Sequence, residues 1–198
     1  MTVVAAIISR HCTAHSSDSL ITRNSDEGTH EILDEVSTKI VPVREWRGIM
    51  AFWGLAVEPD LYKWSTLDWL RERVSHAGEF NGPEPFALDL SERLNRVLSR
   101  MTFRRPNDKG LGIHFTAYER VDGYETPEFF LISNFADASY TQLRPDGIGV
   151  SRETYHHAYC VDPQPEHRDA GFRHAVRDYL DRDGLLLYNN GDPLMFNP

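Results

Sequence analysis

The spacing of hydrophobic residues changes twice along the chain, from short continuous runs to helical spacing and back to short runs. The first run covers residues 3–8, and two more cover 39–43 and 48–53. Short runs rich in β-branched residues predict buried strands. The last two runs are expected to pair through a turn at 44–47, and Pro42 places the earlier one at a sheet edge or bulge.

Two helices are predicted in the middle of the chain. Apolar residues recur every three or four positions over 61–74, and Pro59 and Asp60 favour a helix start just before them. A second apolar stripe covers 87–101, after a loop at 78–85. We expect both stripes to face the core.

Strand patterns return after residue 110, and the mixed segment 11–22 predicts a turn near residues 16–18. The later predicted elements are strands at 111–118, 128–133, 139–143, 148–155 and 184–188, with a helix at 170–179. The order of strands, two helices, strands and helix predicts an α+β protein in which helices pack on antiparallel sheets.

Composition narrows the class of protein. The chain of 198 residues is 40% hydrophobic, which is enough for one domain with a full core over residues 1–198. A net charge of −9 argues against an extended surface for nucleic acid or an anionic membrane, although Arg100, Arg104 and Arg105 form a candidate basic patch. The opening apolar run is too short to span a bilayer and no positive charge precedes it. We therefore expect neither a signal peptide nor an anchor. The two cysteines, Cys12 and Cys160, do not form a disulfide framework and are interpreted as free thiols in a reducing cytoplasm.

Thr2 is a candidate nucleophile because it follows Met1 and directly precedes the first buried run. A threonine hydroxyl is a weak nucleophile that needs a base within hydrogen-bond reach. If Met1 is removed, Thr2 carries that base itself, since a free α-amino group has an ordinary pKa of about 7.7–8.0. A threonine hydroxyl activated by its own amine is a known nucleophile–base pair.

Three further segments support a catalytic role for Thr2. An Asp-Ser pair follows at Asp18, Lys39 heads a strand of the form Lys-Ile-x-x-Val, and a strand ending in a turn with Gly54 precedes the first long helix. With a threonine opening a hydrophobic strand, this order resembles the proteasome β-subunit and HslV-type family, the threonine branch of the N-terminal-nucleophile hydrolases. The resemblance covers about the first half of the chain.

The resemblance implies a role for each matching residue, and the implied catalytic residues are Thr2, Asp18, Lys39, Gly54 and Asn190. Thr2 would be the nucleophile, and Lys39 a buried cation that favours the neutral amine and the developing alkoxide. Asp18 would pair with Lys39, and the backbone N–H of Gly54 would donate to the oxyanion. A serine-containing turn of the family is best matched at 188–192, where Asn190 or Asp192 stands in for the serine.

The resemblance also implies the fold, the reaction and the assembly. The fold is a four-layer αββα sandwich. In the family, two helices and further strands follow the last turn, and this chain has no room for them after residues 188–192. Three interpretations stay open: a truncated member of the family, parts supplied from elsewhere, or a different position for the turn. The reaction is hydrolysis of a peptide or small amide bond through an ester on Thr2, with no cofactor or metal. Family members form rings or open helical rings, so we expect a ring-like homo-oligomer. The alternative is a catalytically inactive subunit of this fold that serves in assembly.

Two other constellations are weaker. The segment His156-His157-Ala-Tyr-Cys160 has metal-binding residue types, but it supplies one ligand pair where zinc sites need two. Cys12, near His15, is conceivable as a nucleophile with a histidine base, although a short polar loop explains the segment equally well. Nucleotide-binding motifs are absent from the sequence.

Overall fold

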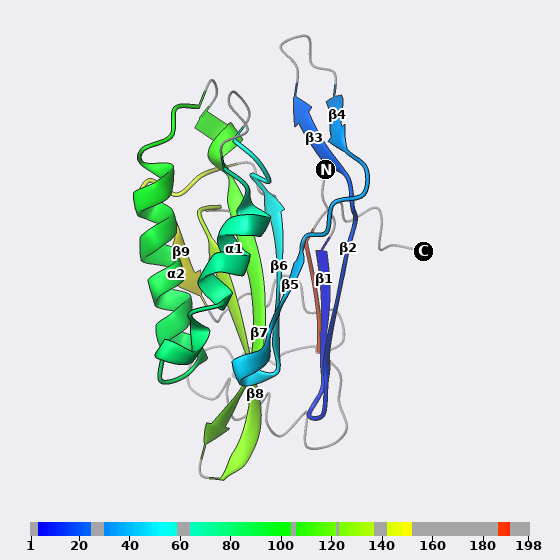
Figure 1. Ribbon diagram of the computed structural model, residues 1–198, viewed down its shortest axis with the longest axis vertical. Helices are drawn as coiled ribbons and strands as arrows, with labels where there is room; N and C mark the ends of the chain where they lie inside the picture. Colours follow the sequence, from blue (N-terminus) through cyan, green and yellow to red (C-terminus); the bar gives the residue numbers. More distant parts are fainter. Residues whose placement is uncertain are drawn as a thin grey trace.

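The helices and sheets of the protein are stacked in three layers in a computed structural model. A pair of helices lies on one face of a five-stranded sheet, and a three-stranded sheet lies on the other face (Figure 1). The structure describes residues 4–24, 30–58, 64–103, 106–121, 123–136, 142–151 and 186–190. Every strand pairing among them is antiparallel, so the predicted mixture of helices and antiparallel sheets is confirmed.

The three-stranded sheet brings the start of the chain beside its last described strand. Its strands, in spatial order, are β10 (Leu186–Asn190), β1 (Val4–Ile8) and β2 (Thr13–Ser17). β1 and β10 correspond to predicted strands, whereas β2 lies in the segment 11–22, for which only a turn was predicted. Three of the five β2 residues are threonine or serine, so hydrophobic periodicity could not identify a strand that depends on its ladder with β1.

The segment between Asp18 and Lys39 contains a separate hairpin. Its strands are β3 (Ile21–Asn24) and β4 (His30–Asp34), which form a two-stranded sheet of their own. The hairpin projects beyond the ends of the two larger sheets (Figure 1). Its first and last residues, Ile21 and Asp34, are register partners, so the chain enters and leaves the hairpin at the same place.

The five-stranded sheet forms the middle layer. Its strands, in spatial order, are β5 (Ile40–Val43), β6 (Gly48–Gly54), β7 (Leu111–Val121), β8 (Tyr124–Ser133) and β9 (Gly149–Ser151). The predicted pairing of the first two strands is confirmed, with a short 3₁₀ turn at Arg44–Trp46 between them. Pro42 is exposed on the edge strand β5, as its missing N–H requires.

The helices are α1 (Thr66–Val74) and α2 (Pro83–Leu98). α2 agrees with the predicted apolar stripe and buries Phe86, Leu90 and Leu94 against the sheet. Neither helix in the described part of the chain is long and apolar enough to cross a membrane.

The predicted start of the first helix near Pro59 and Asp60 is wrong. Ser65 is the N-cap, and its side chain accepts a hydrogen bond from the Asp68 N–H at 3.2 Å. Before the helix begins, Val57 pairs with Ser65 in an isolated antiparallel bridge. This local pairing competes with helix formation, so the helix begins only after Ser65. Residues 59–63 lie outside the described residues.

Alternate residues of β6 serve two different cores. Phe52 belongs to the core beneath the helices, whereas Ala51 and Trp53 belong to a smaller core that includes Val4 of β1. Trp53 is buried, as predicted, and its indole lies over Gly112. A Cβ on Gly112 would lie 2.1 Å from the Trp53 ring, so only glycine fits there.

Polar side chains also join the two sheets. The buried Thr116 hydroxyl of β7 lies 2.9 Å from the Thr13 hydroxyl and 2.9 Å from Nε2 of His15, both on β2. Nδ1 of His15 has no hydrogen-bond partner among the described residues. Burial lowers the pKa of His15 to about 4, so this imidazole is neutral in the folded protein near pH 7.

Acid should weaken the fold through His15. Its pKa is about 4 in the folded state and 6.5 ordinarily, so the unfolded chain binds more protons between these values. The free energy of unfolding should therefore fall by roughly 3 kcal/mol as pH decreases from about 6.5 to 4. His15→Gln should remove this component from urea denaturation curves measured across that range. The control is His11→Gln, at an exposed position in the β1–β2 turn. Equal pH dependence in wild type and His15→Gln would contradict the assignment.

Candidate functional site

Antiparallel pairing gathers the ends of three strands at one end of the three-stranded sheet. β1 begins at Val4, and the register places Ser17 of β2 and Asn190 of β10 opposite it. Asp18 follows Ser17 directly. The positions of Asp18 and Asn190 thus lie at the end of the sheet where β1 begins. Thr2 itself lies outside the described residues, two positions before Val4.

The middle sheet contributes two more strand ends. β5 begins directly after Lys39 and β6 ends at Gly54, so the antiparallel pairing puts both at one end of that sheet. The Phe52 N–H donates to the Lys39 carbonyl oxygen at 3.1 Å, which extends the pairing by one residue. An ion pair between Lys39 and Asp18 links this end to the corresponding end of the three-stranded sheet.

Lys39 is a buried cation with two identified acceptors. Its side chain is 2% exposed, and Nζ donates to Oδ1 of Asp18 at 2.9 Å and to the Leu20 carbonyl oxygen at 2.5 Å. A buried ammonium is costly unless it is paired and hydrogen-bonded, which these groups provide. The contact expected between Asp18 and Lys39 is therefore present. The carbonyl of Leu20 was not predicted, because a backbone acceptor has no signature in the sequence.

Gly54 occupies a backbone conformation that favours glycine. Its φ is +85°, and a Cβ there would lie 2.2 Å from the Gly110 carbonyl oxygen. The next residue, Leu55, donates its N–H to that same oxygen at 2.7 Å. The close approach to the Gly110 carbonyl was not predicted from the sequence, and the missing Cβ of Gly54 permits it.

The backbone N–H of Gly54 is directed toward the Lys39 side of β6. Alternate N–H groups of an antiparallel strand point to the same neighbour, and the Phe52 N–H points to Lys39. The Gly54 N–H therefore points to that side, beyond the last β5–β6 hydrogen bond seen within the described part of the chain. Gly54 itself is exposed at this end of the sheet.

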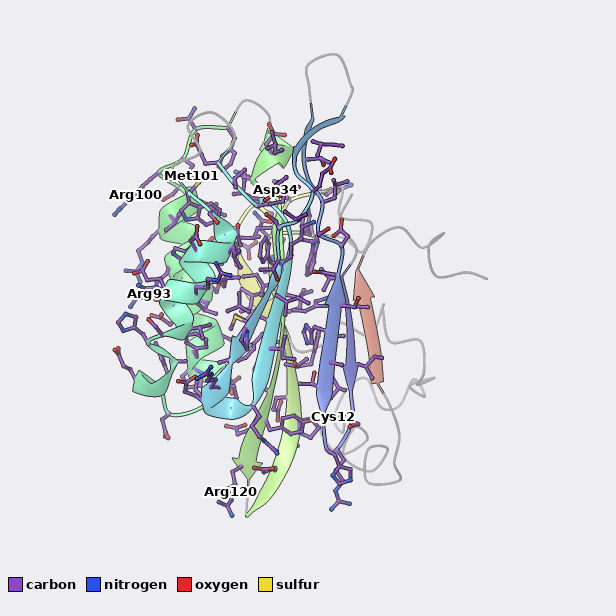
Figure 2. The ribbon with its side chains drawn as sticks, turned by 45° about the vertical axis from the view of Figure 1, so that its right-hand side comes forward. Cys12, Asp34, Arg93, Arg100, Met101 and Arg120 are labelled. Atoms are coloured by element: carbon purple, nitrogen blue, oxygen red, sulfur yellow. The ribbon has the colours of Figure 1, made fainter. Side chains whose placement is uncertain are left out.

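Cys12 is not brought to a histidine base by the contacts the structure describes. It is exposed in the β1–β2 turn, where its Sγ lies 3.3 Å from Oγ of Ser9. Figure 2 shows Cys12 at the end of the molecule opposite Asp34, the last residue of β4. His15, in turn, contacts Thr116. Cys12 is therefore remote from the end of the sheets where Lys39 and Gly54 lie.

The remaining candidates fall mostly outside the described residues. These are residues 156–160, Arg104, Arg105 and Asp192. Arg100 is exposed just after α2 (Figure 2). Within the ranges that the structure describes, no group of three or more His, Cys, Asp or Glu side chains is placed to hold a metal ion.

Removing the two partners of the Lys39–Asp18 pair should have unequal costs. Asp18→Asn leaves the buried ammonium without its counter-charge, and we expect a loss of about 3 kcal/mol. Lys39→Met keeps the apolar stem and leaves Asp18, whose side chain is 28% exposed and can be hydrated, so its loss should be smaller. Urea denaturation of both variants measures the difference. A larger loss for Lys39→Met than for Asp18→Asn would contradict the idea that an uncompensated buried ammonium is the dominant cost.

Comparison with known protein families, curated proteins and solved structures finds no match to this chain. The geometry of the strand ends around Lys39 and Gly54 is therefore the basis for assigning a function.

Proposed function

We propose that the protein is a threonine-type N-terminal-nucleophile hydrolase that cleaves peptide or small amide bonds, with Thr2 as nucleophile after removal of Met1. The observation that carries the proposal is the buried Lys39–Asp18 ion pair, which lies at the end of the sheets where β1 begins. In the sequence, Thr2 lies two positions before Val4, the first residue of β1. A buried cation near a threonine with a free amine is the arrangement that such a nucleophile requires.

Lys39 would act on Thr2 through its charge. A nearby positive charge disfavours protonation of the α-amine and stabilises the alkoxide that develops on Thr2. Asp18 would hold the ammonium in place, since its Oδ1 accepts a hydrogen bond from Nζ at 2.9 Å. The Leu20 carbonyl oxygen is the second anchor of the same ammonium.

Gly54 would supply the oxyanion donor. In the acylation step, the Thr2 hydroxyl oxygen attacks the substrate carbonyl carbon while the α-amine accepts the hydroxyl proton. The negative charge that develops on the carbonyl oxygen would be stabilised by the Gly54 N–H. The amine of the cleaved bond leaves with that proton, and water then hydrolyses the ester on Thr2. Asn190, opposite Val4 in the register, would take the place of the serine contributed by the family's turn.

The finer fold and assembly belong to the same proposal. In a four-layer αββα sandwich, α1 and α2 form one outer layer, and a second helical layer covers the free face of the three-stranded sheet. The side chain of Ile7 on that face is 43% exposed, and the proposed second layer would cover it. We further propose a ring-like homo-oligomer that acts in the cytoplasm.

A catalytically inactive subunit of the same fold is the second candidate. The observation that favours it is that Lys39 and Asp18 already satisfy each other, as a purely structural ion pair would. The two candidates differ in the state of residue 1, because an inactive subunit has no need of a free Thr2 amine.

The intact mass of the protein from cells with normal methionine processing tests the first requirement. We expect a mass lower by one methionine, which places the free amine on Thr2. Retention of Met1 would leave the amine on the wrong residue and would favour the inactive subunit.

Substitution of the proposed residues tests the reaction itself. Thr2→Ala should abolish hydrolysis of a library of unstructured peptides, measured by mass spectrometry of the products. Lys39→Met should lower the rate by roughly 100-fold or more while the circular dichroism spectrum stays native, because the charge that tunes the nucleophile is lost. Lys109→Met, at an exposed lysine, is the matched control and should keep full activity. Equal rates in wild type and Thr2→Ala would remove Thr2 as nucleophile.

A further inference from the structure

The two residues that follow Gly54 are held by the first residue of α1. The Thr66 hydroxyl donates a hydrogen bond to the Leu55 carbonyl oxygen, and the Thr66 N–H donates to the Ala56 carbonyl oxygen at 2.8 Å. Thr66 is completely buried, so water does not compete for either hydrogen bond. One residue therefore binds two successive carbonyl groups just after the proposed oxyanion donor.

The location of Thr66 explains how it can do this. The first N–H groups of a helix have no partner within the helix. At this helix start, the Asp68 N–H donates to the Ser65 hydroxyl, and the Thr66 N–H donates to the Ala56 carbonyl oxygen. The hydroxyl group then adds a donor that a hydrophobic residue of the same shape would lack.

Gly54 is thus held on both sides. On the side before it, Trp53 is buried with its indole over Gly112. On the side after it, Leu55 is held by its N–H bond to Gly110 and by its carbonyl bond from Thr66. Glycine has wide conformational freedom. The contacts of Trp53 and Leu55 therefore act together with the β6–β7 ladder, in which Gly54 pairs with Leu111, to restrict the direction of the Gly54 N–H.

We propose that Thr66 is a positioning residue that sets the orientation of the Gly54 N–H as oxyanion donor, an inference that rests on the proposed hydrolase function. Thr66 does not touch the reacting atoms and acts through Leu55. Its contribution appears in the transition state, where the donor must already be aligned, and so it affects kcat more than KM. A residue that only stabilised the fold would change the melting temperature without this selectivity.

Thr66→Val and Thr66→Ser form the test pair. Valine keeps the shape and removes the hydroxyl, whereas serine keeps the hydroxyl. We expect Thr66→Val to lower kcat for peptide hydrolysis by roughly 10-fold or more with little change in KM, and Thr66→Ser to restore most of the wild-type kcat. Amide NMR of the same proteins provides a readout that does not require activity. The Gly54 amide resonance should shift in Thr66→Val, and the Leu55 amide should exchange faster, with both near wild type in Thr66→Ser.

The outcomes separate this inference from the proposed function. A Gly54 amide that stays unchanged in a folded Thr66→Val protein would overturn the positioning role, whatever happens to kcat. A shifted Gly54 amide together with an unchanged kcat would also overturn it. Wild-type protein that cleaves no peptide, but whose Gly54 amide shifts in Thr66→Val, would overturn the hydrolase function while supporting the control of the Gly54 backbone by Thr66.

Discussion

Burial of the Lys39 ammonium is the constraint on which this end of the molecule depends. A charge that is 2% exposed must find acceptors in the protein, because an unpaired buried ammonium costs several kcal/mol. The acceptors are Asp18 and the Leu20 carbonyl, both in the connection that follows β2. Meeting this requirement brings the end of β2 to the start of β5, and so brings the ends of two different sheets together. The proposed site forms where they meet.

The polar and aromatic contacts between the sheets extend this arrangement along the strands. The Thr116 hydroxyl forms hydrogen bonds with Thr13 and His15 of the opposite sheet. The Trp53 indole occupies the space that the missing side chain of Gly112 leaves open. Because Trp53 directly precedes Gly54, packing between the sheets also constrains the backbone at the proposed oxyanion donor. The same residues therefore stabilise the interior and shape the proposed site. Substitutions in the contact between the two sheets are expected to affect both the free energy of unfolding and the geometry of the site.

Much of the fold could be predicted because strong patterns coincide with the elements. β1, β5 and β6 are short apolar runs, and α2 has a long apolar stripe on one face. The failures have local causes. β2 has few apolar residues and owes its conformation to pairing with β1. The first helix begins later than Pro59 and Asp60 suggest, because Val57 pairs with Ser65 and the Ser65 side chain then caps the helix.

The sequence by itself determined which chemical groups are available: a threonine after Met1, and Asp18, Lys39 and Gly54 in an order that resembles a known family. The tertiary structure alone decided which of these groups meet, because distance across two sheets depends on strand register and on burial. It also decided the backbone partners, including the Leu20 and Gly110 carbonyl oxygens and the Leu55 carbonyl that Thr66 binds. Every residue carries a carbonyl, so only the folded chain can show which carbonyls accept hydrogen bonds from a buried charge and which anchor the backbone around Gly54.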